Sequence, residues 1–525
     1  MSEQNHPHQS MLNKNVAIVG ASSVLGILFD YFFYNKLPPG ISFSLYVLLI
    51  LSGLFILSRN FKERPNKDAL WLVLPLLFFS LMVSVRASYF LAFLNIVMSG
   101  FILLMIARTV FRDKIKDFLI KDYFKIFILP LLFIPAFLRT VSQLIELRGA
   151  FKDHQTLRQI IRGALLAIPA LFIFTILFSS ADLVFQKYIS GLIKIDQETM
   201  VRALLIIFAS FVFIGAFGYI FQKREENISN DRPERKASLG VIETSVLLGL
   251  INLLFFVFIA IQFTYFFGGE SNIKDLGFTY SEYARKGFFE LIVVAIISFL
   301  IVWAAEKDAE KQREEHALPF KIFGALLIIQ VLFIIISAFK RLWLYEEAYG
   351  FTAARLYGHT FVIWLSAAFL LIFYKIFAAQ KENSFAFNIF ISVILFLAAL
   401  NILNPEAFIA RQNLERFDRT GLLDIWYLRQ LSDDALLETI KIINLDPLKT
   451  KAPESFDQLK KSYVRDLYWE ADNRLKQKDQ WQKINLSGWR AKKLLQSKIK
   501  ELEQFKDYSL PNDDGPLEYL KLNSH

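Results

Sequence analysis

Candidate binding residues gather where long apolar stretches of the chain end. Ionisable side chains beside or inside a bilayer are costly to keep there, so those that are present indicate pairing or function. Opposite charges contributed by several loops could form one polar cluster that receives a small ligand or a partner protein. The candidates are Asp30, Arg86, Asp182, Glu282, Arg285, Glu290, Arg341, Tyr345, Glu347, Tyr349, Arg355, Asn404 and Glu406.

Each candidate also fits an ordinary structural role. Glu282 and Lys286 lie four residues apart on an expected helix, where such a pair contributes about 0.2–0.5 kcal/mol. Arg341 and Tyr345 have the same spacing and suit an interfacial belt in which the arginine reaches toward the headgroups. Taken together, the charges favour one cluster. The expected pairs join Arg285, Arg341 or Arg355 to Asp182, Glu282 or Glu347.

The rest of the sequence offers no catalytic or metal-binding pattern. It contains no cysteine, which excludes disulfides, thiolate metal sites and cysteine nucleophiles. Six histidines, at positions 6, 8, 154, 316, 359 and 525, show no metal-ligand spacing, and no HExxH, GxGxxG or Walker A string occurs. We therefore expect no metal and no cofactor, and we name no catalytic residue. An enzymatic role is disfavoured but stays open.

Apolar stretches of membrane-spanning length must position the candidate residues. A bilayer core about 30 Å thick needs about 20 mostly apolar residues per helix. The chain is 54% apolar and 15% aromatic, and its apolar residues fall in runs of this length. We predict an all-α polytopic helical membrane bundle of about 11 spans, within a range of 10–12. The expected spans are 15–34, 41–58, 69–85, 88–107, 164–181, 201–221, 241–267, 287–305, 319–339, 359–379 and 384–402.

The charges of the loops orient these spans. Residues 126–138 are apolar for only 13 residues and contain Pro130 and Pro135, which is typical of a re-entrant or interfacial segment. If they do not cross, one set of loops holds 27 Lys and Arg and the other holds 11; if they cross, the split is about 20 to 18. Because cytoplasmic loops are enriched in Lys and Arg, we expect a cytoplasmic N-terminus and an extracytoplasmic C-terminal region.

The ends of the chain differ from its apolar middle. The first residues are polar and carry no signal-peptide cleavage pattern. Near the C-terminus, residues 455–476 and 488–505 have the apolar spacing of helices, the second with Ser487 as its N-cap. The predicted domains are 1–14, a polar tail; 15–403, the transmembrane helical domain; 404–505, a helical C-terminal domain; and 506–525, a flexible tail.

The formal charge of +10 does not indicate nucleic-acid binding. From Asn404 onward the chain holds 21 Lys and Arg against 20 Asp and Glu, so this region is nearly neutral. The excess of basic residues therefore lies in the short loops of the membrane part, where it sets topology. We expect membrane lipids as partners, and no nucleic acid.

A series of separate strings gives the chain its strongest likeness to other proteins. They are RGALLAIPALFIFTILFSSADLVF, NLLFFVFIAIQFTYFFGG, FTYSEYARKGFFEL, RLWLYEEAYGFTAARLY, NPEAFIARQNLER and QWQKINLSGWRA. In these strings the chain resembles a bacterial family of multi-pass membrane proteins filed as a domain of unknown function, DUF four-one-seven-three, close to DUF four-one-five-three. The resemblance is densest over about 162–495. It implies a bacterial cell-membrane protein with a helical core and brings no activity or catalytic residues.

Three functions compete. The first is sensing or assembly, in which the outer cluster and the C-terminal domain bind a small ligand or a protein partner. The second is a transporter or flippase, although the halves show no clear repeat and no matched pair of broken spans. The third is a lipid-linked glycosyltransferase, with Asp30 and Asp182 as candidate acidic residues, although the outer loop at 35–40 is short for it. We favour the first, in the inner (cytoplasmic) membrane of a bacterium.

Overall fold

The described part of the chain is entirely helical. The computed structural model describes residues 5–111, 113–147, 197–222, 241–267, 288–309, 317–478 and 480–509. Within these ranges the regular structure consists of α-helices and short 3-10 helices, without a strand. The all-α fold expected from the sequence is therefore confirmed.

Nine helices in the described ranges are long and apolar enough to cross a membrane, so the chain is a multi-pass membrane protein. The helix at Val73–Val85, inside the span expected at 69–85, has only 13 residues. The span expected at 164–181 lies outside the described residues. The nine helices are Met11–Phe33, Ile41–Asn60, Tyr89–Thr109, Glu198–Phe221, Glu243–Phe263, Phe288–Glu306, Leu318–Tyr349, Ala353–Phe377 and Glu382–Leu403.

The chain divides into two compact units, and each unit includes a short segment from a distant part of the sequence. The first unit comprises Met1–Arg86, Phe90–Asn227 and Lys478–Leu486. The second comprises Ala87–Tyr89, Ile228–Gln477 and Ser487–His525.

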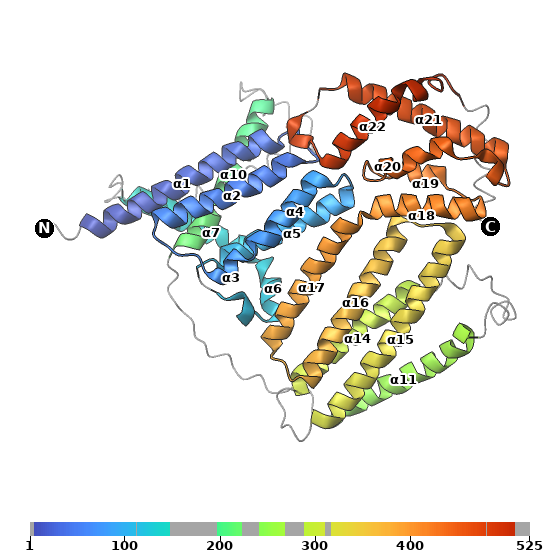
Figure 1. Cartoon of the computed structure of the whole chain (residues 1–525). Coiled ribbons are helices and arrows are strands. Elements are labelled where there is room, and N and C mark those ends of the chain that lie inside the picture. The colour runs from blue at the N-terminus through green and yellow to red at the C-terminus, as the bar shows by residue number, and fades with distance from the viewer. Residues whose placement is uncertain are drawn as a thin grey trace, which may run out of the picture. The chain divides into compact units, whose positions relative to one another are not determined.

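In the first unit, α1 packs along α10 and α7, and α2 packs along α1 and α4 (Figure 1). Near Trp481, the returning C-terminal segment joins the turn between α1 and α2. There the Gly40 and Ile41 N–H groups donate to the carbonyls of Gln482 and Ile484, each at 2.9 Å. The elements are α1 (Asn5–Phe33), α2 (Ile41–Asn60), α3 (Lys67–Leu70), α4 (Val73–Val85), α5 (Tyr89–Thr109), η1 (Ile115–Asp117), α6 (Ile120–Ile126), η2 (Leu129–Leu132), α7 (Phe133–Leu147), α10 (Gln197–Phe221) and η6 (Trp481–Lys483).

Small residues bring three helices of this unit close together. A Cβ atom on Gly26 of α1 would lie 2.8 Å from the Ile206 carbonyl oxygen of α10. A Cβ atom on Gly215 of α10 would lie 2.5 Å from the Phe133 carbonyl oxygen of α7. Close backbone approach at small residues is a common way for helices to associate in lipid.

The segment from α5 to α7 begins and ends at the same end of α10. The ring of Phe111, just after α5, lies 5.3 Å from that of Phe221 at the end of α10. The Gln222 side chain at the same end donates to the Thr140 hydroxyl of α7 at 2.7 Å. Between these points, α6 and the helical segment that follows it are bent by 59°. This path matches a segment that enters and leaves on one side.

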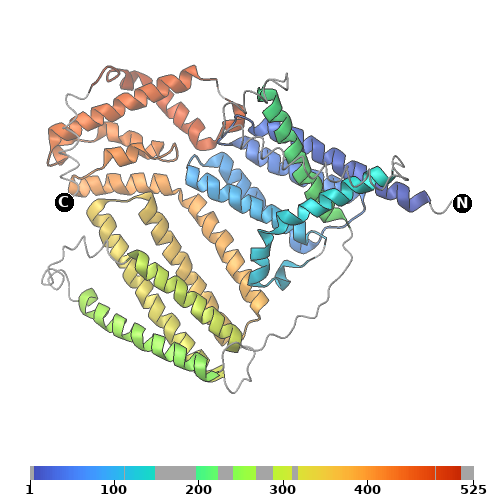
Figure 2. The same cartoon turned by 180° about the vertical axis from the view of Figure 1, so that it is seen from behind.

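In the second unit, α15 packs against α11, α14 and α16, and α17 packs against α16 (Figures 1 and 2). Helix α18 crosses the ends of α16 and α17, and the remaining C-terminal helices lie beyond it (Figure 1). The elements are α11 (Val241–Phe267), α14 (Phe288–Ala309), α15 (Ala317–Tyr349), α16 (Ala353–Phe377), α17 (Glu382–Leu403), α18 (Pro405–Thr420), α19 (Ile425–Arg429), α20 (Leu436–Thr439), η4 (Ile440–Asn444), η5 (Pro447–Lys449), α21 (Pro453–Lys476) and α22 (Leu486–Glu503).

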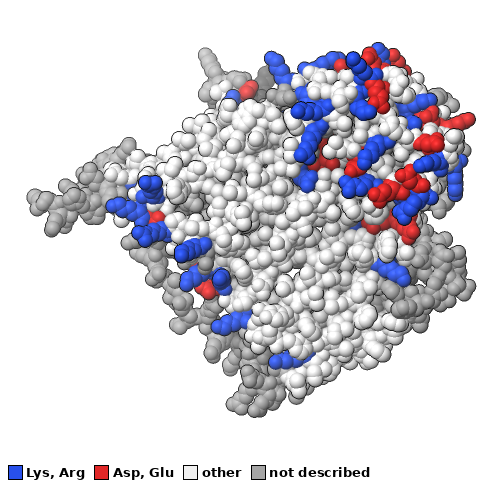
Figure 3. All heavy atoms as spheres, in the orientation of Figure 1, with Lys and Arg blue, Asp and Glu red and all other residues white. Residues whose placement is uncertain are grey.

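The C-terminal helices have an apolar core of their own and a charged surface. The rings of Phe417 in α18 and Phe456 in α21 stack with centroids 5.1 Å apart. Charged side chains gather over this part of the second unit, whereas few appear over α15 to α17 (Figure 3). The helices expected at 455–476 and 488–505 are α21 and α22. The expected capping role of Ser487 is wrong, because α22 begins at Leu486 and Ser487 already lies inside the helix.

Candidate functional site

Helix α18 holds the turn between α15 and α16. The Asn413 side chain accepts the Phe351 N–H and donates to the Phe351 carbonyl, both at 2.8 Å. The Arg416 guanidinium donates to the carbonyls of Glu347 at 2.9 Å and Ala348 at 2.6 Å. Asn413 and Arg416 are both buried. The two side chains therefore bond to backbone groups near the helix ends that would otherwise need water as a partner.

The same turn depends on a glycine. Gly350 has a φ of +82°, a conformation that other residues adopt only with strain. A Cβ atom there would also lie 2.6 Å from the Asn413 side-chain oxygen. The turn is thus shaped to admit the side chains of α18.

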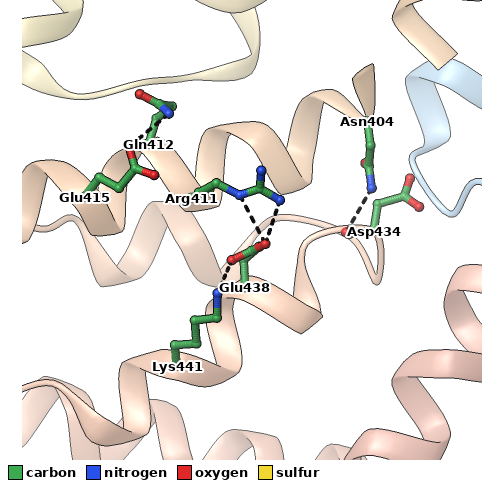
Figure 4. Close-up of polar contacts among 7 residues, drawn as sticks. All are labelled: Asn404, Arg411, Gln412, Glu415, Asp434, Glu438 and Lys441. Atoms are coloured by element: carbon green, nitrogen blue, oxygen red, sulfur yellow. Dashed lines mark hydrogen bonds and ion pairs between the residues drawn. The ribbon is translucent and has the colours of Figure 1, made fainter. Parts of the chain in front are cut away.

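Asp434, between α19 and α20, bonds to the chain at two of the places where it enters the second unit, at Ala87–Ser88 and at Ser487. One carboxylate oxygen accepts the N–H groups of Ala87 at 3.1 Å and Ser88 at 2.9 Å. The other accepts the Ser487 hydroxyl at 2.5 Å. Asp434 is buried, so these bonds to a charged group are of the stronger kind. Its carbonyl accepts the Asn404 side-chain amide at 3.4 Å (Figure 4).

Glu406 and Tyr427 complete this arrangement. Glu406, in the first turn of α18, accepts the Ser432 N–H at 2.5 Å. The Tyr427 hydroxyl accepts the Ala353 N–H at the start of α16 at 2.6 Å. Burial raises the pKa of Tyr427, and the negative charge of Glu406 adds to this effect. We refer to Asn404, Glu406, Asn413, Arg416, Tyr427 and Asp434 as the polar joint.

An aromatic and cationic stack lies at the end of α15. The guanidinium of Arg355 lies 4.1 Å from the ring centroid of Tyr345 and also donates to the Gly350 carbonyl. The rings of Tyr345 and Tyr349 are 4.9 Å apart. A cation over an aromatic face is worth about 0.5–1 kcal/mol at exposed sites and more when desolvated. Arg355 is thus held by a ring and a backbone carbonyl.

Two ionisable pairs are buried along α16. His359 has Nδ1 3.1 Å from the Glu346 carboxylate and Nε2 3.2 Å from the Phe339 carbonyl. A carbonyl can only accept a hydrogen bond, so Nε2 carries a proton. A hydrogen bond between Nδ1 and the Glu346 carboxylate then needs a second proton, either on Nδ1 or on the carboxylate oxygen. Further along α16, the Lys375 ammonium donates to the Glu306 carboxylate of α14.

A network of ion pairs joins α18 to α20 (Figure 4). Glu438 accepts from Arg411 at 2.9 Å and from Lys441 at 2.6 Å. Burial works to raise the pKa of Glu438, but bonds from these two cations lower it below its usual range. Gln412 donates to Glu415 at 3.2 Å nearby. Pairs of this exposed kind contribute little individually.

The structure distributes the candidates named from the sequence over both units. The turn and joint of the second unit bring together Tyr345, Glu347, Tyr349, Arg355, Asn404 and Glu406, with Arg341 two helical turns before the end of α15. Glu347 contributes its backbone carbonyl there, and its side chain is exposed. Glu290 is exposed in the first turn of α14. Asp182, Glu282 and Arg285 lie outside the described residues, so the pairs expected of them are not visible.

Two candidates belong to the first unit. Asp30 is buried near the end of α1 and accepts from the Arg202 guanidinium of α10 at 2.7 and 3.1 Å. Arg86 follows the last residue of α4 in extended conformation. Arg202 therefore partners Asp30, a pairing that sequence reasoning did not identify.

The central residues of the joint were also missed. Asn413 and Arg416 are three apart on an amphipathic helix, a spacing that places them on one face and could have indicated a shared role. Asp434 gave no such signal, because its partners Ala87 and Ser88 lie 347 and 346 residues away. Among the described residues, no group of three or more His, Asp or Glu side chains is arranged to hold a metal ion.

Comparison with known proteins identifies one family. A family model described as "Domain of unknown function (DUF4153)" matches residues 73–442, which cover the joint, the stack and both buried pairs. This is the second of the two related families suggested by the sequence, and the assignment to DUF four-one-seven-three is not confirmed. No curated protein and no solved structure matches the chain.

Proposed function

Because the chain belongs to the family described as a domain of unknown function (DUF4153), we propose a function from its own geometry. The protein acts in sensing or assembly in a bacterial inner membrane. It binds a ligand or partner with its C-terminal helices and passes that event to the membrane helices through the polar joint. Its N-terminus is cytoplasmic and its C-terminal helices are extracytoplasmic.

The polar joint is the observation that carries this proposal. Asp434 bonds to Ser88 and Ser487, at two of the places where the chain enters the second unit, and Arg416 bonds to the turn between α15 and α16. The polar groups of the joint bond largely to backbone groups of neighbouring segments, so they hold these segments together. Through such a connection, a ligand that binds the C-terminal helices would change the conformational equilibrium of the membrane helices. Coupling between two sites requires a link of this kind.

The path of the chain supports the orientation. The segment that follows α5 returns, through α7, to the end of α10 where it began, and this path supports the model in which the segment adds no crossing. The loop-charge asymmetry then assigns the N-terminus to the cytoplasm. Fusions of alkaline phosphatase and of a fluorescent protein after His525 test this. We expect phosphatase activity and no cytoplasmic fluorescence; the reverse result would place the C-terminal helices in the cytoplasm.

Asp434→Ala tests the joint itself. Its loss removes bonds to a charged acceptor worth about 1.5–3 kcal/mol each. We expect faster hydrogen exchange at Ala87 and Ser88 and in the turn at Gly350, together with failure to complement a strain that lacks this protein. Asp446→Ala is the matched control, since Asp446 accepts only the nearby Leu448 N–H at an exposed turn. Equal effects of the two variants would contradict the proposal.

Transport remains the second candidate, favoured by the buried pairs of α16. Ionisable groups inside a membrane often lie on ion or proton pathways. Reconstituted protein that moves protons or a solute, and loses this with Glu346→Gln while complementing normally with Asp434→Ala, would favour transport. No described geometry favours the glycosyltransferase, because the Asp30 carboxylate is held by Arg202.

A further inference from the structure

A cavity of about 220 Å³ opens between α19, α20 and α21, next to the polar joint, because Ser432, whose N–H bonds to Glu406, is one of its lining residues. Its floor is apolar and buried, formed in part by Leu428, Leu436 and Leu467. Pockets for drug-sized ligands measure about 300–1,000 Å³, so this one suits a smaller molecule.

One side of the cavity rim carries an excess of positive charge. Arg429 at the end of α19 lies 2.5 Å from the Asp466 carboxylate of α21. Arg465, which is not a lining residue, also donates to Asp466, at 2.9 Å. Asp466 is thus shared by two guanidinium groups, so it neutralises Arg429 only in part. Arg429 is partly exposed and lines the cavity.

The opposite charge is in excess one turn further along α21. Arg474 donates to both oxygens of Asp433, at 3.0 and 2.6 Å. It also lies 2.5 Å from one oxygen of Glu470. Two carboxyl groups thus share one guanidinium, and both line the cavity. Burial raises the pKa of Glu470, Arg474 works to lower it, and Asp433 raises it further, so a second cation would stabilise the ionised form.

The rim is therefore dipolar, and its two halves are one helical turn apart. Residues four apart on a helix have Cβ atoms about 5–6 Å from each other, which places Asp466 and Glu470 at that separation. A ligand complementary to this rim carries an anionic group and an ammonium group a few bonds apart, with an apolar part for the leucine floor. Tyr463, one turn before Asp466 on α21, also lines the cavity, and its buried side chain bonds to Thr439.

We propose that this cavity binds a small zwitterion, namely a free α-amino acid with an aliphatic side chain. Its carboxylate meets Arg429, its ammonium meets Glu470 and Asp433, and its side chain lies on Leu428, Leu436 and Leu467. The inference rests on the proposed sensing function, for which it names the ligand class.

Isothermal titration calorimetry of the full chain in detergent with L-leucine tests the site. We expect leucine to bind, and N-acetyl-leucine and leucine amide to bind at least about tenfold more weakly, equal to about 1.4 kcal/mol. Each analogue lacks one of the two charges. Glycine should also bind more weakly, because it leaves the floor uncovered. No heat with leucine, or equal binding of all four compounds, would overturn the proposal.

Variants locate the binding. Glu470→Gln and Arg429→Gln should each weaken leucine binding at least about tenfold, about 1.4 kcal/mol. Lys476→Gln, on the same helix and paired with Asp472 outside the cavity, should leave it unchanged. If Glu470→Gln and Arg429→Gln do not fold, competition with phosphoethanolamine in the unaltered chain decides instead. Phosphoethanolamine that binds more tightly than leucine would overturn the amino-acid assignment in favour of a lipid headgroup.

The test of the zwitterion site and the test of the proposed function give separate answers. A chain that binds no zwitterion but needs Asp434 for complementation would overturn only this inference. A chain that binds leucine but complements normally with Asp434→Ala would uphold this site and contradict the joint.

Discussion

The two units differ in the contacts that hold their membrane helices together. In the first, α1, α7 and α10 approach closely because Gly26 and Gly215 leave no room for a side chain between backbones. In the second, α14, α15 and α16 are joined by long ionisable side chains that meet inside the bundle, as Lys375 and Glu306 do. Since lipid tails are as apolar as leucine, helices in a membrane gain little from hydrophobic contact and need either close packing or polar pairing. At these contacts, the first unit should lose stability when atoms are added and the second when atoms are removed, although the Asp30–Arg202 pair also joins α1 to α10.

The largest effect is expected from Lys375→Ala. The lysine side chain is fully buried and that of Glu306 is 9% exposed, so removal of the lysine takes a cationic partner away from a carboxylate inside the bundle. Breaking a buried pair in this way costs about 3–5 kcal/mol. Unfolding of the purified protein in a denaturing-detergent titration measures the loss.

A double variant sharpens this test. Lys375→Met combined with Glu306→Leu removes both charges and keeps similar volume, so stability should return close to that of the unaltered chain. A double variant as unstable as the single one would show that packing around Lys375, rather than charge, sets its role.

An intermediate effect is expected from Gly215→Ala in the first unit. The added Cβ would lie 2.5 Å from the Phe133 carbonyl oxygen, and backbone cannot move aside easily. Overpacking of this kind costs about 1–3 kcal/mol. Gly20→Ala in α1 is the control, because a Cβ atom there meets nothing within 4 Å. Thermal unfolding should separate the two variants, and a matched loss in both would argue against close packing as the cause.

The smallest effect is expected at the surface of the C-terminal helices. Glu438→Gln should lower the free energy of unfolding at pH 7 by about 1 kcal/mol or less, because its partners Arg411 and Lys441 are exposed. Cations lower the pKa of Glu438 in the folded state, so the unfolded chain binds more protons in acid. The stabilisation is therefore present above the unfolded pKa and lost as the pH falls through the folded one.

A pH series of the difference between Glu438→Gln and the unaltered chain measures this. The difference should shrink as the solution becomes acidic. Glu415→Gln, whose carboxylate accepts only from Gln412, serves as control and should show a smaller difference at every pH. A Glu438 difference that grows in acid would contradict the assigned direction.

Hydropathy was sufficient to predict most of the membrane helices. In lipid, the backbone N–H and C=O groups of a long apolar run must bond to each other, which a helix achieves. The runs 241–267 and 384–402 therefore predicted α11 and α17 directly. The apolar spacing of 455–476 likewise predicted α21. Boundaries were less accurate, as at Ser487, because helix starts depend on long-range contacts as well as on capping preferences.

The candidate binding site stays a prediction. Arg355 was expected to meet a carboxylate, whereas it lies over the ring of Tyr345. The partner of Asp30 was not found, since Arg202 lies 172 residues further along the chain. His359 was set aside because no second histidine lies at ligand spacing, yet its partner is a carboxylate, Glu346. Periodicity reports the face of a helix but not which distant residue will lie opposite it.

The exchange of segments between the units has a consequence for biosynthesis. The N–H groups of Gly40 and Ile41, in the turn between the first two helices, bond to carbonyls of Gln482 and Ile484. The ribosome synthesises that turn long before it reaches those residues. The first helices therefore enter the membrane before the partners of Gly40 and Ile41 exist. Maturation of the N-terminal part must therefore wait for translation of the C-terminal part. A nascent chain that stalls or is truncated before Lys478 would expose the unfinished turn to the proteases that survey the membrane.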